Sequence, residues 1–390
     1  MSNQVGDKFL NKIKCIDLFV TEECNLNCTY CFHTKDQVVL SIEQGKKIID
    51  RLHELSPESF KITFFGGEPL LYPETVLQLA LYAREKWGYD EKGKPKTAFA
   101  ITTNATYYDE EMFKKYRDLG FTFMVSIDGD EITNNENRPG DFKLITDNIK
   151  KMVKFLPDVQ ARMTYTPKTV GRLAINVQFI HEELGINTIL HQAVIEDNWT
   201  EDSLKIYKYQ LNQLYHYRRF KLRQNSKLSI VWIDKVLKIL NDEVPSEFTF
   251  CEAGKSYIGV MANGDVYPCH RAASSKIFKL GNIFDEIPFI RGMFLNIDKE
   301  YVGCSKNCEA FRSCHSCIIT NYKVNKELTK PVTSYCNICK AEYELARSYM
   351  PVELNDRQER LTNFMASMLV ELSKQNEEIL ERIKNDNRTG

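Results

Sequence analysis

The stretch CNLNCTYCFHTK, residues 24–35, holds three cysteines within eight residues and follows them with a histidine. The spacing is CxxxCxxC, given by Cys24, Cys28 and Cys31. A structural zinc ion takes four ligands in a closed tetrahedron, so a zinc site here would need His33 as its fourth ligand. Three thiolates on a four-iron cluster would instead leave one iron open to a small molecule. We favour the cluster and expect His33 to be a loop residue.

The stretch follows the first of six short β-branched or aromatic runs, each succeeded by an amphipathic helical pattern. Such repetition predicts parallel strands joined by helical crossovers. Ser41 and Asp109 are expected N-caps of two helices, and Gly120 and Gly185 are expected stops. Six units fall short of the eight that close a TIM barrel, so we predict an α/β fold with a partial (β/α)6 TIM-like barrel. Its ligands should lie at the carboxyl ends of the strands. The predicted strands cover residues 14–20, 61–65, 97–103, 121–127, 159–164 and 188–194.

The composition is that of an ordinary globular protein, with 390 residues, 43% hydrophobic and 27% charged. The 52 basic and 53 acidic side chains give a net charge of -1, so we expect no nucleic-acid partner. The N-terminus lacks the apolar core of a signal peptide, and no run approaches the roughly 18 apolar residues of a membrane span. We therefore expect a cytoplasmic protein without a membrane partner. Reduced cysteines in that compartment indicate metal binding rather than disulfides.

Eight of the 12 cysteines fall between Cys251 and Cys339, where helical periodicity fades. This density predicts a second domain organised by metal ligands, which would contribute much of its folding free energy. The predicted domains are a barrel over residues 1–225, a cysteine-rich domain over 226–350 and a C-terminal amphipathic helix over 351–390. That helix would pack on the protein's own body or contact a partner. Its apolar face comprises Leu361, Phe364, Met365, Met368, Leu369 and Leu372.

The three-cysteine loop resembles the signature of the radical S-adenosylmethionine superfamily, CxxxCxΦC, with Tyr30 as the aromatic residue. FFGGEP, residues 64–69, ends the second predicted strand and is similar to the family's GGE segment, which holds the methionine amino group of the cofactor. The two glycines permit close backbone approach, and the glutamate is a carboxylate available to an ammonium. The resemblance thus implies cofactor contacts from Gly66, Gly67, Glu68 and Pro69.

Two further segments match the family in order, TTN at residues 102–104 and SIDG at residues 126–129. The resemblance implies that Asn104, Ser126 and Asp128 contact the cofactor. It also implies that Arg138 pairs with the cofactor's carboxylate. Without the resemblance, Asn104 and Asp128 would be strand-end caps and Arg138 a solvated loop charge.

The C-terminal cysteines resemble the SPASM extension, which binds auxiliary clusters, although two spacings within the central group depart from its usual pattern. The resemblance implies two auxiliary [4Fe–4S] clusters, the first on Cys251, Cys269 and Cys317 and the second on Cys304, Cys308, Cys314 and Cys336. The first cluster would have either an open iron or a fourth ligand from Cys339, His315 or His270. Without the N-terminal motif, these cysteines would indicate zinc ribbons. Cys15 is expected to be a small buried hydrophobe.

The family's reaction is reductive cleavage of S-adenosylmethionine to methionine and a 5′-deoxyadenosyl radical, which abstracts a hydrogen atom. The resemblance therefore implies an oxidoreductase that needs an electron donor such as flavodoxin or ferredoxin. SPASM proteins mostly modify peptides or proteins, so we expect a maturase that crosslinks a ribosomally made peptide through a thioether or carbon–carbon bond.

Only about 13 residues precede the first predicted strand, which leaves no room for an N-terminal leader-binding domain. A separate leader-recognition protein, or the C-terminal helix, would then supply that role. One alternative is an anaerobic sulfatase-maturating enzyme that forms formylglycine, although YPCHR lacks the aspartate that group has after this cysteine. An alternative of another class is a non-catalytic zinc-binding interaction protein.

Overall fold

The computed structural model describes residues 13–35, 37–156, 158–243, 251–273, 275–285, 308–314, 316–351, 355–359 and 368. Several predicted residues lie outside these ranges. They are Cys304, His315 and, apart from Met368, the apolar face expected on the C-terminal helix.

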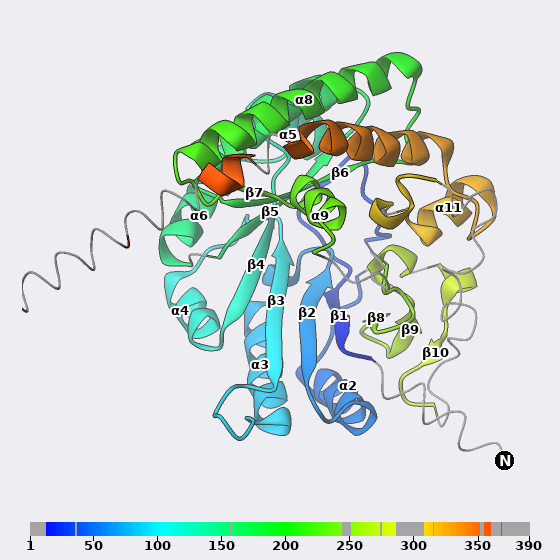
Figure 1. The fold of residues 1–390 in the computed structure, drawn as a ribbon. Coiled ribbons are helices and arrows are strands. Elements are labelled where there is room, and N and C mark those ends of the chain that lie inside the picture. The colour runs from blue at the N-terminus through cyan, green and yellow to red at the C-terminus, as the bar shows by residue number, and fades with distance from the viewer. Residues whose placement is uncertain are drawn as a thin grey trace, which may run out of the picture.

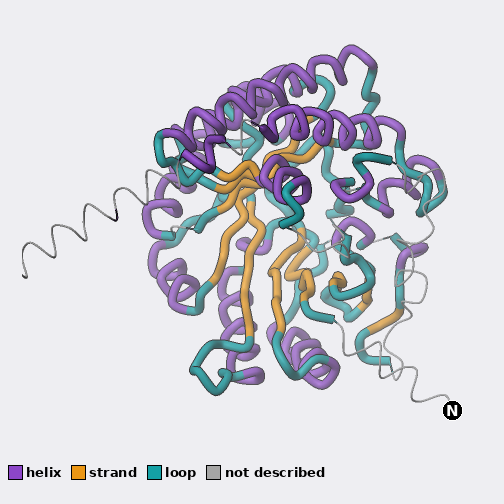
Figure 2. Tube along the Cα trace, viewed as in Figure 1, coloured by secondary structure: helices purple, strands orange, loops and turns teal. Residues whose placement is uncertain are grey.

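Ten strands of the described chain form one sheet in the order β10-β9-β8-β1-β2-β3-β4-β5-β6-β7. Strands β1 to β6 are parallel and curve around a common interior, with helices outside (Figures 1 and 2). The six predicted strands are confirmed to within one residue at each end. The strands are β1 Cys15–Thr21, β2 Phe60–Gly66, β3 Thr97–Thr103, β4 Phe121–Ser126, β5 Gln160–Tyr165, β6 Thr188–Ala193, β7 Ser229–Ile230, β8 Tyr257–Val260, β9 Asp265–Tyr267 and β10 Gly281–Asn282.

The two helix starts and two helix ends that the sequence predicts are found in the structure. Ser41 Oγ accepts a hydrogen bond from Gln44 N, and Asp109 Oδ1 accepts one from Met112 N, which confirms both N-caps. Gly120 and Gly185 both have φ of 75°, a left-handed conformation that favours glycine at a helix end. The helices are α2 Ile42–Leu55, α3 Pro73–Trp87, α4 Glu110–Asp118, α5 Glu131–Asn137, α6 Phe142–Phe155, α7 Leu173–Glu182, α8 Glu201–Arg223, α9 Val231–Leu240 and α11 Ile318–Asn325.

The side chains of β1 alternate between two hydrophobic clusters, as the two-residue period of a strand requires. Ile16 and Leu18 belong to the main core between the sheet and its outer helices. Phe19 points to the other face, where it packs with Phe65 of β2 in a second cluster that includes Cys269. The inner face of the barrel is therefore in contact with the cysteine-rich segment.

Strand pairing holds the cysteine-rich segment to the barrel, which the sequence did not predict, and its organisation by metal ligands remains a prediction. Strand β8 pairs in parallel with β1, from Cys15 opposite Tyr257 to Leu18 opposite Val260. Strands β9 and β10 then continue the same sheet in antiparallel fashion. The segment thus satisfies the backbone groups that β1 would otherwise leave unpaired at an edge. The predicted domain boundaries remain predictions.

A helix over residues 333–351 crosses the top of the barrel beside α8 (Figure 1). Tyr207 on α8 donates a hydrogen bond of 2.7 Å to Glu342, and the rings of Tyr215 and Tyr349 stack 4.9 Å apart. These contacts attach the end of the cysteine-rich segment to the barrel. Within the described part of the chain, no helix combines the length and apolar character needed to cross a bilayer.

Candidate active site at the carboxyl ends of the strands

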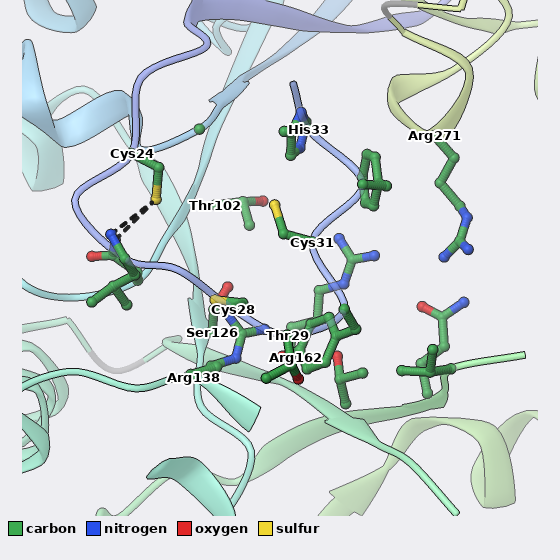
Figure 3. A pocket seen from close by; sticks show the side chains of 18 of the residues that line it. Cys24, Cys28, Thr29, Cys31, His33, Thr102, Ser126, Arg138, Arg162 and Arg271 are labelled. Carbon is green, nitrogen blue, oxygen red and sulfur yellow. Dashed lines mark hydrogen bonds between the residues drawn. The ribbon is translucent and has the colours of Figure 1, made fainter. Parts of the chain in front are cut away.

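A cavity of about 390 Å³ opens at the carboxyl ends of the parallel strands (Figure 3). Its wall contains residues from the three-cysteine loop, from β2 to β6 and from the cysteine-rich segment. The structure therefore brings together segments that are far apart in sequence, as the β/α pattern predicted. The predicted site residues that line it are Cys24, Cys28, Cys31, Gly66, Gly67, Glu68, Asn104, Ser126 and Arg138.

Two of the three thiols in the loop have hydrogen-bond donors directed at their sulfur atoms. Leu26 N lies 3.4 Å from Cys24 Sγ, the contact drawn as a dashed line in Figure 3. Arg138 Nη1 lies 3.7 Å from Cys28 Sγ. Burial raises the pKa of the Cys28 thiol, and the Arg138 guanidinium opposes that rise. A cation and an N–H directed at sulfur favour the thiolate form, which is the form that ligates iron.

The double glycine lets two parts of the protein's own backbone approach each other. Gly66 has φ of 138°, and a Cβ on it would lie 1.9 Å from Thr21 O. A Cβ on Gly67 would lie 2.1 Å from Glu23 O. Gly67 N donates to Thr21 O at 2.9 Å, so the end of β2 is fixed to the residues just before Cys24. The glycines thereby position the cysteine loop, a role that the sequence did not reveal.

Glu68 is 1% exposed, and both of its carboxylate oxygens accept hydrogen bonds from the protein. Oε1 accepts from Leu70 N and from Thr103 Oγ1, and Oε2 accepts from Asn104 N at 2.6 Å. Burial raises the pKa of this carboxyl to about 7, although the three hydrogen bonds oppose the rise. Glu68 thus joins the ends of β2 and β3. Pro69 is buried in the short helix Pro69–Leu71 and does not line the cavity.

Asp128 and Arg138 form a buried ion pair beneath the cavity. Arg138 Nε lies 3.1 Å from Asp128 Oδ1, and Asp128 also accepts hydrogen bonds from Tyr30 Oη at 2.6 Å and from Thr164 N. Arg138 is 8% exposed, so the reading of a solvated loop charge is wrong. Asp128 does not line the cavity, whereas Ser126 and Arg138 do, and Figure 3 shows both beside Cys28.

Asn104 caps the end of β3 and also reaches the cysteine loop. Its Oδ1 accepts a hydrogen bond from Thr106 N at 3.0 Å. Its Nδ2 donates to Asn25 Oδ1 and lies 3.8 Å from Cys24 Sγ. The Asn104 side chain therefore both caps the end of β3 and contacts the cysteine loop.

His33 packs among aromatic rings, with centroids 5.8 Å from Phe19, 4.3 Å from Phe32 and 5.7 Å from Phe65. Burial lowers the pKa of His33 to about 3, with the nearby His270 as the next cause. The imidazole is therefore neutral at physiological pH and forms part of the apolar wall of the cavity.

Three cysteines of the second segment lie in one hydrophobic cluster, Cys251, Cys269 and Cys317. Burial raises the pKa of Cys251 to about 11, and the proximity of Cys317 adds to the rise. No three Cys, His, Asp or Glu side chains converge tightly enough to hold a single metal ion within the described ranges. A four-iron cluster differs in this respect, because each thiolate binds a different corner.

The remaining predicted ligands have different surroundings. Cys339 is 3% exposed on the helix over residues 333–351, which also carries Cys336. His270 Nδ1 lies 2.7 Å from Asp17 Oδ2 and 2.6 Å from Tyr257 Oη, so this nitrogen is engaged within the protein. Cys15 begins β1 and is only partly buried, less than the sequence predicted.

Five charged residues of the cavity wall were not predicted from sequence: Arg162, Glu196, Asp197, Arg271 and Lys323. The segment QARMTY, residues 160–165, contained a usable signal for the first of them. Ala161, Met163 and Tyr165 alternate as buried residues, which leaves an arginine on the inner face of β5. No comparable pattern surrounds the other four.

Comparison with known proteins supports the same interpretation. Residues 18–191 match the radical SAM superfamily profile, and residues 251–318 match SPASM, an iron–sulfur cluster-binding domain. A cysteine-type anaerobic sulfatase-maturating enzyme of Clostridium novyi is 23% identical over 83% of this chain and 92% of its own length. The Fe-coproporphyrin III synthase of Methanosarcina barkeri is 38% identical over 30% of this chain. The chain spans only 28% of that synthase and 41% of an uncharacterized Methanocaldococcus jannaschii relative.

Two solved structures share the fold. The AdoMet-bound enzyme anSMEcpe has a TM-score of 0.73 and 20% identity, covering 88% of this chain and 96% of its own. SuiB of Streptococcus suis, bound to the precursor peptide SuiA, has a TM-score of 0.59 and 16% identity, covering 85% and 77%.

The partial barrel carries three thiols and an arginine around one cavity at its strand ends, a ligand set suited to an iron–sulfur cluster. The chain belongs to the radical S-adenosylmethionine superfamily and carries a SPASM region. The radical SAM domain implies a [4Fe–4S] cluster that binds S-adenosylmethionine, and the SPASM region implies auxiliary iron–sulfur clusters. The chain's site residues fit that cofactor set, because the cavity is lined by three thiols, and N–H donors are directed at the sulfur atoms of Cys24 and Cys28.

Proposed function

We propose that Cys24, Cys28 and Cys31 ligate the catalytic cluster and that S-adenosylmethionine occupies the cavity beside them. The support is that these thiols line the same cavity as Ser126 and Arg138. In this arrangement Arg138 receives the cofactor's carboxylate, and Asp128 fixes the orientation of the guanidinium from below. Glu68 acts indirectly, because its carboxylate joins β2 to β3 and leaves the backbone of the double-glycine segment to meet the cofactor.

When bound, the cluster and cofactor supply the radical that removes a hydrogen atom from a substrate carbon. The chain's task is to hold that carbon in place and to keep other hydrogen donors away. Phe32, His33 and Phe65 form an apolar part of the cavity wall suited to excluding water. Residues 192–194, 196 and 197, at the end of β6 and just after it, complete the wall together with Arg271 and Lys323.

The substrate we propose is a peptide, in which the enzyme oxidatively forms a thioether or carbon–carbon crosslink. The cavity supports this proposal because Arg271 of the SPASM region and Lys323 of α11 line it together with the three-cysteine loop. Hence a peptide side chain inside it would lie between the radical source and the auxiliary clusters, which would accept the second electron. Two structural neighbours were solved with peptides, SuiB with SuiA and anSMEcpe with Cp18Cys peptide. The proposal includes a flavodoxin or ferredoxin donor, a separate leader-recognition protein and a cytoplasmic location.

A second candidate is formylglycine formation in a sulfatase. It is favoured by the match to the sulfatase-maturating enzyme over 92% of that protein's length. Against it stands His270, at the position after Cys269 where we expect an aspartate in that group. In this chain the imidazole is held by Asp17 and Tyr257.

The experiment is mass spectrometry of peptides incubated anaerobically with the reconstituted enzyme, S-adenosylmethionine and a reductant. The substrates are short peptides encoded beside the gene and a sulfatase-derived cysteine peptide. A crosslink lowers the mass of the peptide by two hydrogen atoms and suppresses backbone fragmentation between the two linked residues. Formylglycine instead replaces a cysteine thiol with an aldehyde that reacts with hydrazine. Stoichiometric 5′-deoxyadenosine without either product would contradict both candidates, and a colourless zinc protein without iron would contradict the enzyme itself.

A further inference from the structure

Arg162 is a charged side chain in the cavity that the proposed cofactor contacts do not use. It lies on the inner face of β5 and lines the cavity with Ser126 and Thr164. Within the described part of the chain, its guanidinium makes no hydrogen bond or ion pair. Burial, and then the nearby charges of Arg271 and Arg138, lower the pKa of Arg162. A desolvated, unpaired guanidinium is costly unless an anion binds it.

A second cation lines the same cavity from the segment that follows the SPASM match. Lys323 on α11 lines the cavity, with its ammonium 5.6 Å from the centroid of the Phe32 ring. It forms no ion pair with a carboxylate of the described chain. Burial lowers the pKa of Lys323, and the charge of Arg271 adds to that effect.

Arg271 lies close to both cations but is neutralised. Its Nη2 donates to Glu196 Oε1 at 2.5 Å and to Thr320 Oγ1 at 3.1 Å. Figure 3 shows Arg271 reaching toward the cavity from the SPASM side, whereas Arg162 belongs to the barrel. Glu196 is therefore paired with Arg271, and neither Arg162 nor Lys323 forms an ion pair within the described residues.

The cofactor does not account for these two charges. In the proposed arrangement Arg138 binds the carboxylate of the cofactor. Arg138 Nη1 lies 3.7 Å from Cys28 Sγ, beside the proposed catalytic cluster. Arg162 is on β5, the strand next to β4, which ends at Ser126. Lys323 is on α11. This is the part of the cavity left for the substrate.

We propose that Arg162 and Lys323 together bind a carboxylate of the substrate, so that the enzyme selects an acidic peptide. This inference rests on the proposed peptide-modifying function. A guanidinium receives a carboxylate through two parallel hydrogen bonds, and an ammonium adds a point charge from the other wall. The carboxylate belongs to an aspartate or glutamate side chain next to the modified residue, or to the C-terminus of the peptide.

The test is isothermal titration calorimetry on the anaerobic holoenzyme with S-adenosylmethionine bound. The probes are N-acetylglutamate methylamide, its glutamine counterpart as the neutral control, and N-acetylglutamine with a free α-carboxylate. For the native enzyme we expect one acidic probe to bind at least about tenfold more tightly than the neutral one. The probe that shows the preference tells whether a side-chain or a C-terminal carboxylate is recognised.

The preference should vanish in Arg162→Gln combined with Lys323→Gln and should persist in part in Arg162→Lys. The matched control is Arg117→Gln combined with Lys143→Gln, two exposed cations on the outer helices α4 and α6, which should keep the full preference. Equal binding of acidic and neutral probes by the native enzyme would overturn the proposal. So would a variant in which Arg162→Gln weakens cofactor binding and leaves the probe preference intact, because Arg162 would then serve the cofactor.

The two proposals fail in different ways. An enzyme that modifies no peptide but still prefers the acidic probe would defeat the proposed function and leave the carboxylate site standing. Conversely, a peptide maturase whose product yield is unchanged when acidic residues near the modification site are amidated would defeat the carboxylate site alone.

Discussion

Arg138 Nε lies 3.1 Å from Asp128 Oδ1, and the two side chains are 10% and 0% exposed. Removing one partner of a buried pair leaves the other charge without compensation, which typically costs about 3–5 kcal/mol. We therefore expect Asp128→Asn to lower the free energy of unfolding by an amount in that range, measured by urea denaturation. The control is Asp118→Asn, which breaks the exposed pair with Arg117 and should have a far smaller effect. Equal losses would show that the buried pair has no special role.

The double glycine gives a steric prediction. Gly66→Ala should destabilise the protein by about 1–3 kcal/mol or more, because the new Cβ would meet Thr21 O at 1.9 Å. Gly93→Ala is the matched control, since Gly93 also has a positive φ but no atom within 4 Å of a Cβ. It should lose only the backbone term of about 1–2 kcal/mol. Thermal unfolding compares the two variants, and a milder effect at Gly66 would contradict the close approach.

The cysteine loop gives a prediction about iron content. Cys28→Ala should remove the catalytic cluster, so that iron falls by about one third from roughly twelve atoms per chain. Release of 5′-deoxyadenosine should be abolished. Cys15→Ala is the control, because Cys15 begins β1 and does not line the cavity. Colorimetric iron assay and chromatography of the nucleoside measure both quantities. A Cys28→Ala enzyme that still cleaved the cofactor would refute the ligand assignment.

Glu68 gives a prediction about pH. Its folded-state pKa of about 7 lies above the ordinary value of 4.5, so the neutral form is favoured in the fold. The stabilisation is complete below about pH 4.5 and is lost as pH rises through 7, a change of about 3 kcal/mol. In Glu68→Gln this pH dependence should disappear. Urea midpoints at pH 5 and pH 8 measure it, and the same slope in both proteins would show that another group is responsible.

The barrel could be predicted from sequence because its determinants are local. Each strand is a short apolar run, and caps such as Ser41 and Asp109 lie one residue before the helices they start. The location of the site followed from the same logic, since a strand's carboxyl end places its loop in the cavity. The cysteine spacing pointed to Cys24, whereas Gly67 and Ser126 were assigned through the resemblance to the radical S-adenosylmethionine superfamily.

The remaining features depend on contacts between distant segments, which a single sequence does not encode in a readable way. The pairing of β1 with β8 joins Cys15 to Tyr257, and no local pattern marks those two strands as neighbours. The hydrogen bonds that Glu68 accepts from Leu70, Thr103 and Asn104 could not be predicted, because Thr103 and Asn104 come from another strand end. No sequence pattern distinguishes Lys323 from the other lysines, and its place in the cavity wall becomes visible only when the fold positions α11.

Strand β1 lies between β2 and β8, and it leads directly to the loop that begins at Cys24. Cys269 follows β9, which is bonded to β8, so the two cysteine segments share one continuous hydrogen-bonded ladder. Adjacent strands in a sheet are about 4.8 Å apart, a spacing that thermal motion barely changes. An electron tunnelling between metal centres held there would cross a gap set by backbone geometry. We therefore expect its transfer rate to be insensitive to solvent viscosity, unlike that of a hinged two-domain carrier.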